Sequence, residues 1–169
     1  FSFFRIPLDY TYFCLFFFLL ISFNIQAASF KLTQNFGKQG IVELNLSHGD
    51  DRGEIVRVDS SGHPLIAITS NFERSSDVFL CRLMPSGKND VTFGEQGCLQ
   101  VDLGGREYVY GMELQKDGKI VLAGFVKRKF KQTPWVARFL PSGIPDISFG
   151  KNGVVELPVV GKTEIHYLA

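Results

Sequence analysis

Phe93-Gly94-Glu95-Gln96-Gly97 opens a stretch of sequence that is repeated on both sides. Phe-Gly pairs begin at Phe36, Phe93 and Phe149, which are 57 and 56 residues apart. The Pro-Ser-Gly triplets that begin at Pro85 and Pro141 are also 56 residues apart. Several motifs that share one period are typical of repeat proteins, in which each unit is one supersecondary structure.

Each unit has the pattern of four short strands. In the central unit, apolar and polar residues alternate over 99–103, and apolar side chains stand at every second position of 108–114 and 135–139, which predicts strands. The run 120–123 is continuously apolar, as in a strand that is covered on both faces. The second strand is expected to place Tyr108, Tyr110, Met112 and Leu114 on one face. The strand at 99–103 is expected to have a counterpart in each neighbouring unit. Their apolar residues are Val42, Leu44 and Leu46 in the preceding unit and Val155, Leu157 and Val159 in the next.

Turn residues separate these strands. Asp117-Gly118 is a strong hairpin signal, and Gly118 is expected to have a positive φ. Gly62 is its counterpart in the preceding unit. Gly87 and Gly143 stand at the fourth position of Pro-containing turns that suit type I geometry.

Together these patterns predict an all-β fold of antiparallel four-stranded units. The units lie at about residues 36–92 and 93–148, with a partial unit at 149–169. Such units are typical of β-propeller blades, so we expect part of a propeller. A β-sandwich of hairpins is the alternative, although it does not explain the repetition. Because repeat units bury their apolar faces on neighbours, we expect a piece of a longer protein that self-associates by itself.

The combined motifs resemble the delta-60 repeat family. Its turn motif is matched best by Asp146-Ile147-Ser148-Phe149-Gly150, and its hairpin motif by residues 117–124. Residues 61–65 depart from the hairpin motif, and the resemblance covers about Leu32 to the end. It implies a β-propeller-like fold, often in exported bacterial proteins, and it implies no activity.

The N-terminal segment has the pattern of a secretory signal peptide. Residues 10–30 carry no charge, their densest apolar run is 13–21, and the small residues Ala27-Ala28-Ser29 follow. We expect removal of residues 1–28, which leaves residues 29–169 as a secreted or periplasmic protein. The alternative is a membrane anchor at residues 10–30, and a membrane is a partner only in that case.

Composition limits the classes of function. The 169 residues are 45% hydrophobic, enough for one domain with a buried core. The near balance of 18 basic and 17 acidic residues argues against a nucleic-acid partner. No serine-nucleophile elbow, phosphate loop or paired-histidine spacing is present, so no catalytic, cofactor-binding or metal-binding residue is assigned and no cofactor is expected.

Two charged stretches are candidate binding loops. The first contains Asp50, Asp51 and Arg52 between glycines, and the second is the basic run Lys127, Arg128 and Lys129. Carboxylates in a glycine-flanked loop could hold Ca²⁺, but the spacing is not that of a calcium loop, so a solvated turn is the simpler interpretation.

Cys81 and Cys98 are expected to be free thiols. Cys81 aligns with Ala137 of the next unit and Cys98 with Val154, so both have the pattern of small apolar core residues. Export would nevertheless permit a disulfide.

The sequence thus predicts an exported, non-catalytic repeat protein that acts as a binding or scaffold module. Its ligand is an unidentified protein or glycan. The alternative is an enzyme whose active site lies at the propeller axis and is completed by further units.

Overall fold

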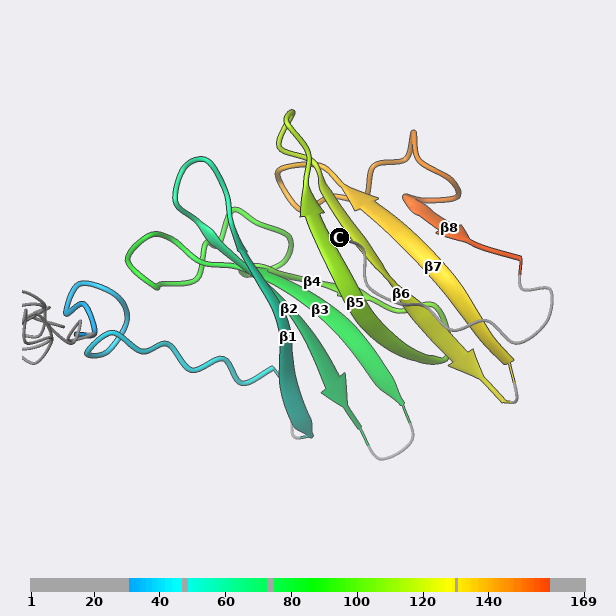
Figure 1. The fold of residues 1–169 in the computed structure, drawn as a ribbon, viewed down its shortest axis with the longest axis horizontal. Coiled ribbons are helices and arrows are strands. Elements are labelled where there is room, and N and C mark those ends of the chain that lie inside the picture. The colour runs from blue at the N-terminus through cyan, green and yellow to red at the C-terminus, as the bar shows by residue number, and fades with distance from the viewer. Residues whose placement is uncertain (1–30, 47–48, 73–74, 130, 159–169) are drawn as a thin grey trace, which may run out of the picture. The chain divides into compact units, whose positions relative to one another are not determined.

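The computed structural model describes residues 31–46, 49–72, 75–129 and 131–158. The described residues from Leu32 onward belong to one compact unit. The described residues form eight strands and no helix, so the predicted all-β class is confirmed (Figure 1). The strands are β1 (Asp50–Val58), β2 (Pro64–Asn71), β3 (Ser76–Arg82), β4 (Cys98–Val101), β5 (Arg106–Leu114), β6 (Ile120–Arg128), β7 (Lys131–Phe139) and β8 (Val154–Glu156).

The strands are arranged as two antiparallel groups of the same design. In the first sheet β1, β2, β3 and β4 pair in that order, and in the second sheet β5, β6, β7 and β8 do so. One parallel bridge, between Ser76 and Arg106, links the two groups, so that all eight strands are connected by hydrogen bonds in one open array. The two groups are still called the first and the second sheet below. Figure 1 shows the first sheet, in cyan and green, beside the second, in yellow-green to orange.

The sheets are offset from the sequence units by one strand. β4 belongs to the sequence unit that begins at Phe93, but it pairs with β3 of the preceding unit. β8 pairs with β7 in the same way. Each sheet therefore combines three strands of one sequence unit with the first strand of the next.

This offset explains one prediction that was wrong. Residues 42–46 were expected to form a strand, but they belong to no strand in the structure. Their equivalents in β4 are extended and paired because β3 lies beside them. The described chain has no strand before Val42 that could play this part, and a strand without a partner leaves its backbone groups unpaired.

A second correction concerns the faces of β5. The pairing of β5 with β6 shifts between Val109 and Gly111, which is a β-bulge. Val109 and Met112 are therefore both buried, whereas Tyr110 is 45% exposed. The prediction that Tyr108, Tyr110 and Met112 share one face was wrong, because a bulge reverses the alternation of side chains along a strand.

One hydrophobic core contains side chains of both sheets. In the first sheet, Leu65, Ala67, Val78 and Leu80 contribute from one face. In the second sheet the core side chains include Ile120, Leu122, Trp135, Ala137 and Phe139. In each case they stand at alternate positions, as the pleat of a strand requires.

The recurrent Asp-x-x-Phe-Gly motif fixes the segment that leads from β3 to β4. The Asp90 carboxylate accepts hydrogen bonds from Arg82 Nε at 2.8 Å and from the Thr92 hydroxyl at 2.6 Å. The Arg82 guanidinium lies 4.6 Å from the centre of the Phe93 ring, which is fully buried. The same three contacts recur one unit later, around Arg138, Asp146 and Phe149.

The predicted turn glycines all have positive φ. The values are 83° at Gly62, 84° at Gly87, 81° at Gly118 and 84° at Gly143, which confirms the prediction for Gly118. Asp117 Oδ1 accepts a hydrogen bond from the Lys119 amide within the same hairpin.

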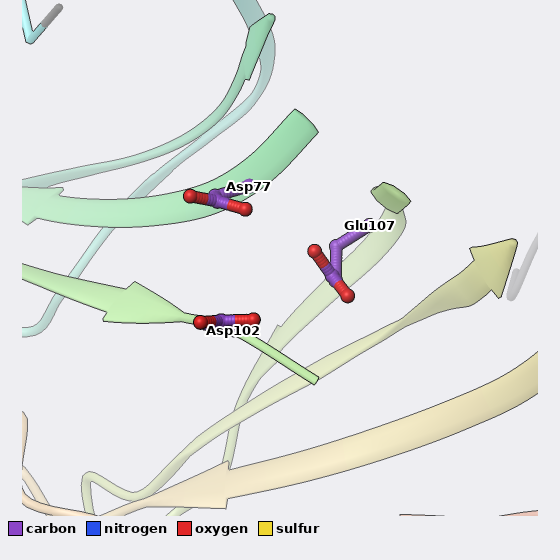
Figure 2. A group of neighbouring side chains, drawn as sticks. All are labelled: Asp77, Asp102 and Glu107. Atoms are coloured by element: carbon purple, nitrogen blue, oxygen red, sulfur yellow. The ribbon is translucent and has the colours of Figure 1, made fainter. Parts of the chain in front are cut away.

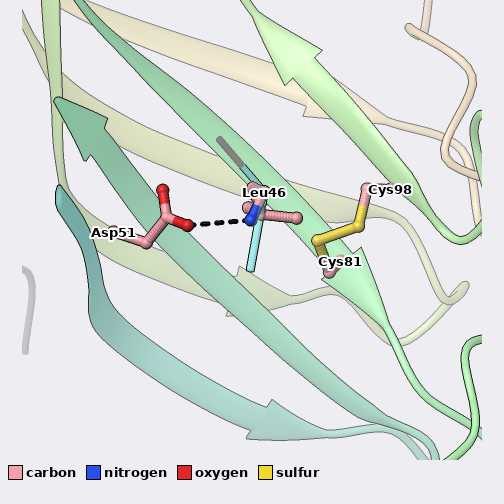
Figure 3. The surroundings of a disulfide bond; sticks show 4 residues. All are labelled: Leu46, Asp51, Cys81 and Cys98. Atoms are coloured by element: carbon pink, nitrogen blue, oxygen red, sulfur yellow. Dashed lines mark hydrogen bonds between the residues drawn. A yellow bond between two sulfur atoms is a disulfide. The ribbon is translucent and has the colours of Figure 1, made fainter. Parts of the chain in front are cut away.

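The prediction of two free thiols was wrong. Cys81 and Cys98 form a disulfide (Figure 3). They are directly opposite each other on β3 and β4, and their Cα atoms are 4.0 Å apart. Ala137 and Val154 are also a cross-strand pair, so the sequence alignment was right about equivalence. It could not show that the two positions adjoin, because the strands come from different sequence units.

Candidate functional site

The first predicted binding loop lies within β1. The carboxylate of Asp51 accepts hydrogen bonds from the Leu46 amide at 2.8 Å and from the Ser70 hydroxyl at 2.6 Å (Figure 3). Asp51 therefore holds the segment before β1 against the first sheet. Asp50 and Arg52 are exposed, and Arg52 Nε lies 3.5 Å from Glu54.

The second predicted loop straddles the end of β6. Lys127 and Lys129 are exposed, and Lys129 has a φ of 50° in the turn. Arg128 instead donates to both oxygens of Glu156, at 2.8 and 2.9 Å, and to the Leu103 carbonyl. Its hydrogen bonds to Glu156 raise the pKa of Arg128, so this guanidinium is a structural link between β6 and β8.

Three carboxylates that sequence analysis did not connect come together where the first sheet meets the second. Asp77 lies in β3, Asp102 directly follows β4, and Glu107 lies in β5. One oxygen of each lies within 4.8 Å of one oxygen of the others. Figure 2 shows the Glu107 carboxylate with one oxygen turned toward Asp77 and Asp102. We call these residues the acidic cluster.

Each carboxylate of the acidic cluster is held by a donor on one of its oxygens. Glu107 Oε1 accepts from the backbone amides of Leu103 and Gly105, at 3.2 and 3.0 Å. Asp77 Oδ2 accepts from Gln100 Nε2 at 2.7 Å. Asp102 Oδ1 accepts from the Gly104 amide at 2.8 Å.

Glu107 is the unusual member of this cluster. Its side chain is fully buried, with 0% exposure, and its Oε2 atom has no hydrogen-bond partner among the described residues. Burial raises the pKa of Glu107, and the negative charges of Asp77 and Asp102 raise it further, against the two backbone amides that lower it. Burial of a polar atom without a partner is costly, so this oxygen calls for an explanation.

The residue equivalent to Glu107 in the preceding unit has a hydrogen-bond donor on each of its carboxylate oxygens. Asp51 aligns with Glu107, and both carboxylates accept a hydrogen bond from a leucine amide in the preceding segment. In the first sheet the other carboxylate oxygen accepts from Ser70. In the second sheet the residue equivalent to Ser70 is Val126, which has no donor, and Asp77 and Asp102 approach instead.

His63 lies in a surface pocket between the hairpin turns of the two sheets. Its Nδ1 atom is 3.2 Å from each Asp59 carboxylate oxygen, and Arg82, Lys116 and Pro141 line the same pocket. Among the described residues, no serine or threonine hydroxyl hydrogen-bonds to His63. This pocket therefore provides a carboxylate–imidazole pair without a hydroxyl nucleophile.

Each sheet also has an apolar face that points away from the shared core. On the first sheet, Ile66 and Ile68 line a pocket together with Phe36, Val42 and Leu44. On the second sheet, half-buried apolar side chains stand on the opposite face, at Val121, Phe125, Val136 and Val155. The Phe125 ring stacks with Tyr108 and Tyr110, with ring centres 4.8 and 5.5 Å apart. The described chain has no further sheet to cover either face.

The predicted signal peptide at residues 1–28 lies outside the described residues. Within the described ranges, no helix has the length and apolarity to cross a membrane. No protein-family model, curated protein or solved structure matches this chain, so its resemblance to the delta-60 repeat family stays a prediction from its motifs.

Proposed function

We propose that the chain is an exported, non-catalytic repeat module that serves as a scaffold by stacking its sheets on those of a second copy. In this proposal the protein partner is the same repeat, and binding uses the sheet faces rather than the charged stretches 50–52 and 127–129.

The interface between the two sheets carries the proposal. Within the chain, the face with Leu65, Ala67 and Leu80 shares a core with the face that carries Leu122 and Trp135. We call these the Leu65 face and the Leu122 face. They are opposite faces of the repeat unit, so the contact is head-to-tail.

Each face of one sheet has an equivalent face on the other sheet, whose residues stand 56 positions away in the sequence. The Leu65 face of the first sheet corresponds to the Val121 face of the second, which carries Val121 and Val136. The Leu122 face corresponds to the Ile66 face of the first sheet, whose Ile66 and Ile68 line the apolar pocket. The two faces outside the shared core are therefore equivalent to the pair that already pack together inside the chain, and Phe36, Val42 and Leu44 line the Ile66 face only in part. Repeat proteins stack by repetition of such contacts.

The disulfide supports the exported location. Cys81 and Cys98 are bonded between neighbouring strands, and disulfides persist in oxidising compartments outside the cytoplasm. This agrees with the signal-peptide pattern of residues 1–28.

Light scattering of the purified protein over a range of concentrations tests the stacking. The wild-type mass is expected to rise with concentration. Val136→Lys places a charge on the Val121 face, and Ile66→Lys places one on the Ile66 face. Each variant alone should be monomeric, because burial of an unpaired charge opposes the contact. An equimolar mixture of the two should form dimers, because each variant retains the face that its partner lacks.

The control is Ile147→Lys, at a side chain that is 82% exposed and lies in a turn outside both faces. It should associate like the wild type, and circular dichroism should show that all variants are folded. A wild-type protein that remains monomeric at every concentration, or a mixture that forms no dimer, would contradict the proposal.

A further inference from the structure

We infer that Asp77, Asp102 and Glu107 form a binding site for a divalent cation, with calcium as the best match, where the first sheet meets the second (Figure 2). Each carboxylate has one oxygen fixed by a hydrogen-bond donor of the protein. Among the described residues, the other oxygen of Glu107 is buried and has no such donor. A cation would take the place of this missing donor.

The spacing of the carboxylates fits calcium. The ligand oxygens lie within 4.8 Å of one another. Calcium binds oxygen at about 2.3–2.6 Å, so two ligands on opposite sides of the ion are about 4.6–5.2 Å apart. Magnesium binds oxygen at about 2.0–2.1 Å and demands a near-regular octahedron, whereas calcium accepts irregular groups of carboxylates and water. Asp102 is exposed, so solvent can reach the site and water can complete the coordination.

The buried oxygen of Glu107 is the independent reason to expect a cation. Glu107 has 0% exposure, and its Oε2 atom has no hydrogen-bond partner in the part of the chain that the structure describes. The charge of Glu107 contributes to the raised pKa of Arg128, but the donors of Arg128 are directed to Leu103 and Glu156. At the equivalent place in the first sheet, Asp51 receives a hydroxyl donor from Ser70 instead. Beside Glu107, Val126 stands in place of Ser70, and two carboxylates of the first sheet, Asp77 and Asp102, lie near Glu107.

A cation at this site would connect three segments that backbone pairing joins weakly. One parallel bridge, between Ser76 and Arg106, is the only ladder contact between β3 and β5. A calcium ion would add a link between β3, β5 and the segment after β4. The three carboxylates do not line the pocket that Ile66 and Ile68 form, and this inference does not depend on the stacking of two copies.

Calorimetric titration of calcium chloride into the EDTA-treated protein at pH 7 tests the inference. One calcium per chain is expected, with a dissociation constant on the order of 10⁻⁴ M, the range of exported calcium modules. Ten millimolar calcium should raise the melting temperature by about 5 °C, because the ion binds the folded state alone. The same concentration of magnesium should give a smaller shift.

Glu107→Gln separates a cation site from a purely structural carboxyl group. The amide retains the acceptor oxygen for Leu103 and Gly105, and its NH₂ can donate to Asp77 and Asp102. The calcium-free variant should therefore melt no lower than the wild type, while its calcium affinity falls at least about tenfold, a difference of about 1.4 kcal/mol. Asp77→Asn should also weaken calcium binding and tests a second ligand.

The matched control is Asp51→Asn, which alters the equivalent carboxylate in the first sheet. This variant should respond to calcium as the wild type does, whatever its own stability. The inference is overturned if the wild type shows neither binding heat nor a melting shift at ten millimolar calcium. It is also overturned if Glu107→Gln and Asp77→Asn bind calcium as tightly as the wild type.

Discussion

Glu107 and Asp51 show how one repeat position can have two environments. Both are carboxylates that accept from a leucine amide of the preceding segment. Ser70 completes the surroundings of Asp51, whereas Val126 replaces that hydroxyl beside Glu107. With valine in place of serine at this position, the buried Oε2 atom of Glu107 lacks the hydroxyl donor that Asp51 has. The proposed cation site depends on this difference.

At the same scale, Gly118 is expected to tolerate no side chain. Its φ of 81° is strained for residues with a Cβ atom, and an added Cβ would lie 3.2 Å from the Pro141 ring. Gly118→Val should lower the free energy of unfolding by about 1–3 kcal/mol, measured by urea denaturation.

The control for this prediction is Gly53→Val in β1, where an added Cβ meets no atom within 4 Å. Valine suits a strand, so this change should cost much less. Equal stability of Gly118→Val and the wild type would show that the hairpin does not need a glycine.

At the scale of elements, the pairing of β4 with β3 joins consecutive sequence units. The two strands share four paired positions, from Val78–Val101 to Cys81–Cys98, and the disulfide is the last of these. β8 repeats the pairing on β7 without a disulfide, because Ala137 and Val154 stand at the equivalent place. The second sheet therefore provides a natural replacement for the disulfide of the first.

The double change Cys81→Ala and Cys98→Val copies this replacement. It should lower the free energy of unfolding by about 3 kcal/mol, because the disulfide closes a loop with a sequence separation of 17 residues in the unfolded chain. Chemical denaturation with and without reductant measures the effect.

Reductant should destabilise the wild type and leave the double variant unchanged. Thiol labelling of the denatured, unreduced protein provides the second check, and neither Cys81 nor Cys98 should react. Labelling of both residues would show that the strands are held by backbone pairing alone.

In the whole molecule, two sheets of one design share one core, and each has a second apolar face outside that core. The stacking proposal uses these faces, and the acidic cluster lies at the junction between the sheets. In the charged stretches 50–52 and 127–129, Asp51 and Arg128 join neighbouring segments, and Asp51 also lines the apolar pocket of the first sheet.

Export is the prediction that concerns the complete chain. Mass spectrometry of the exported protein should find an N-terminus within a few residues of Ala28, because the apolar run 13–21 is followed by small residues. Replacement of Ala27 and Ala28 by bulky residues should block removal. Recovery of residues 13–21 in the mature protein would favour the membrane anchor.

Local patterns in the sequence account for most strands and for the turns. Alternating residues specified strands, Asp117-Gly118 specified a hairpin, and the 56-residue period specified two similar sheets, because side-chain direction and turn geometry follow from neighbouring residues. The pairing of strands between units became visible in the three-dimensional fold. That offset brings Cys81 to Cys98, leaves residues 42–46 outside the sheets and gathers Asp77, Asp102 and Glu107 from three segments. Such contacts depend on how strands that are distant in the sequence pack together, so the local periodicity of the sequence does not predict them.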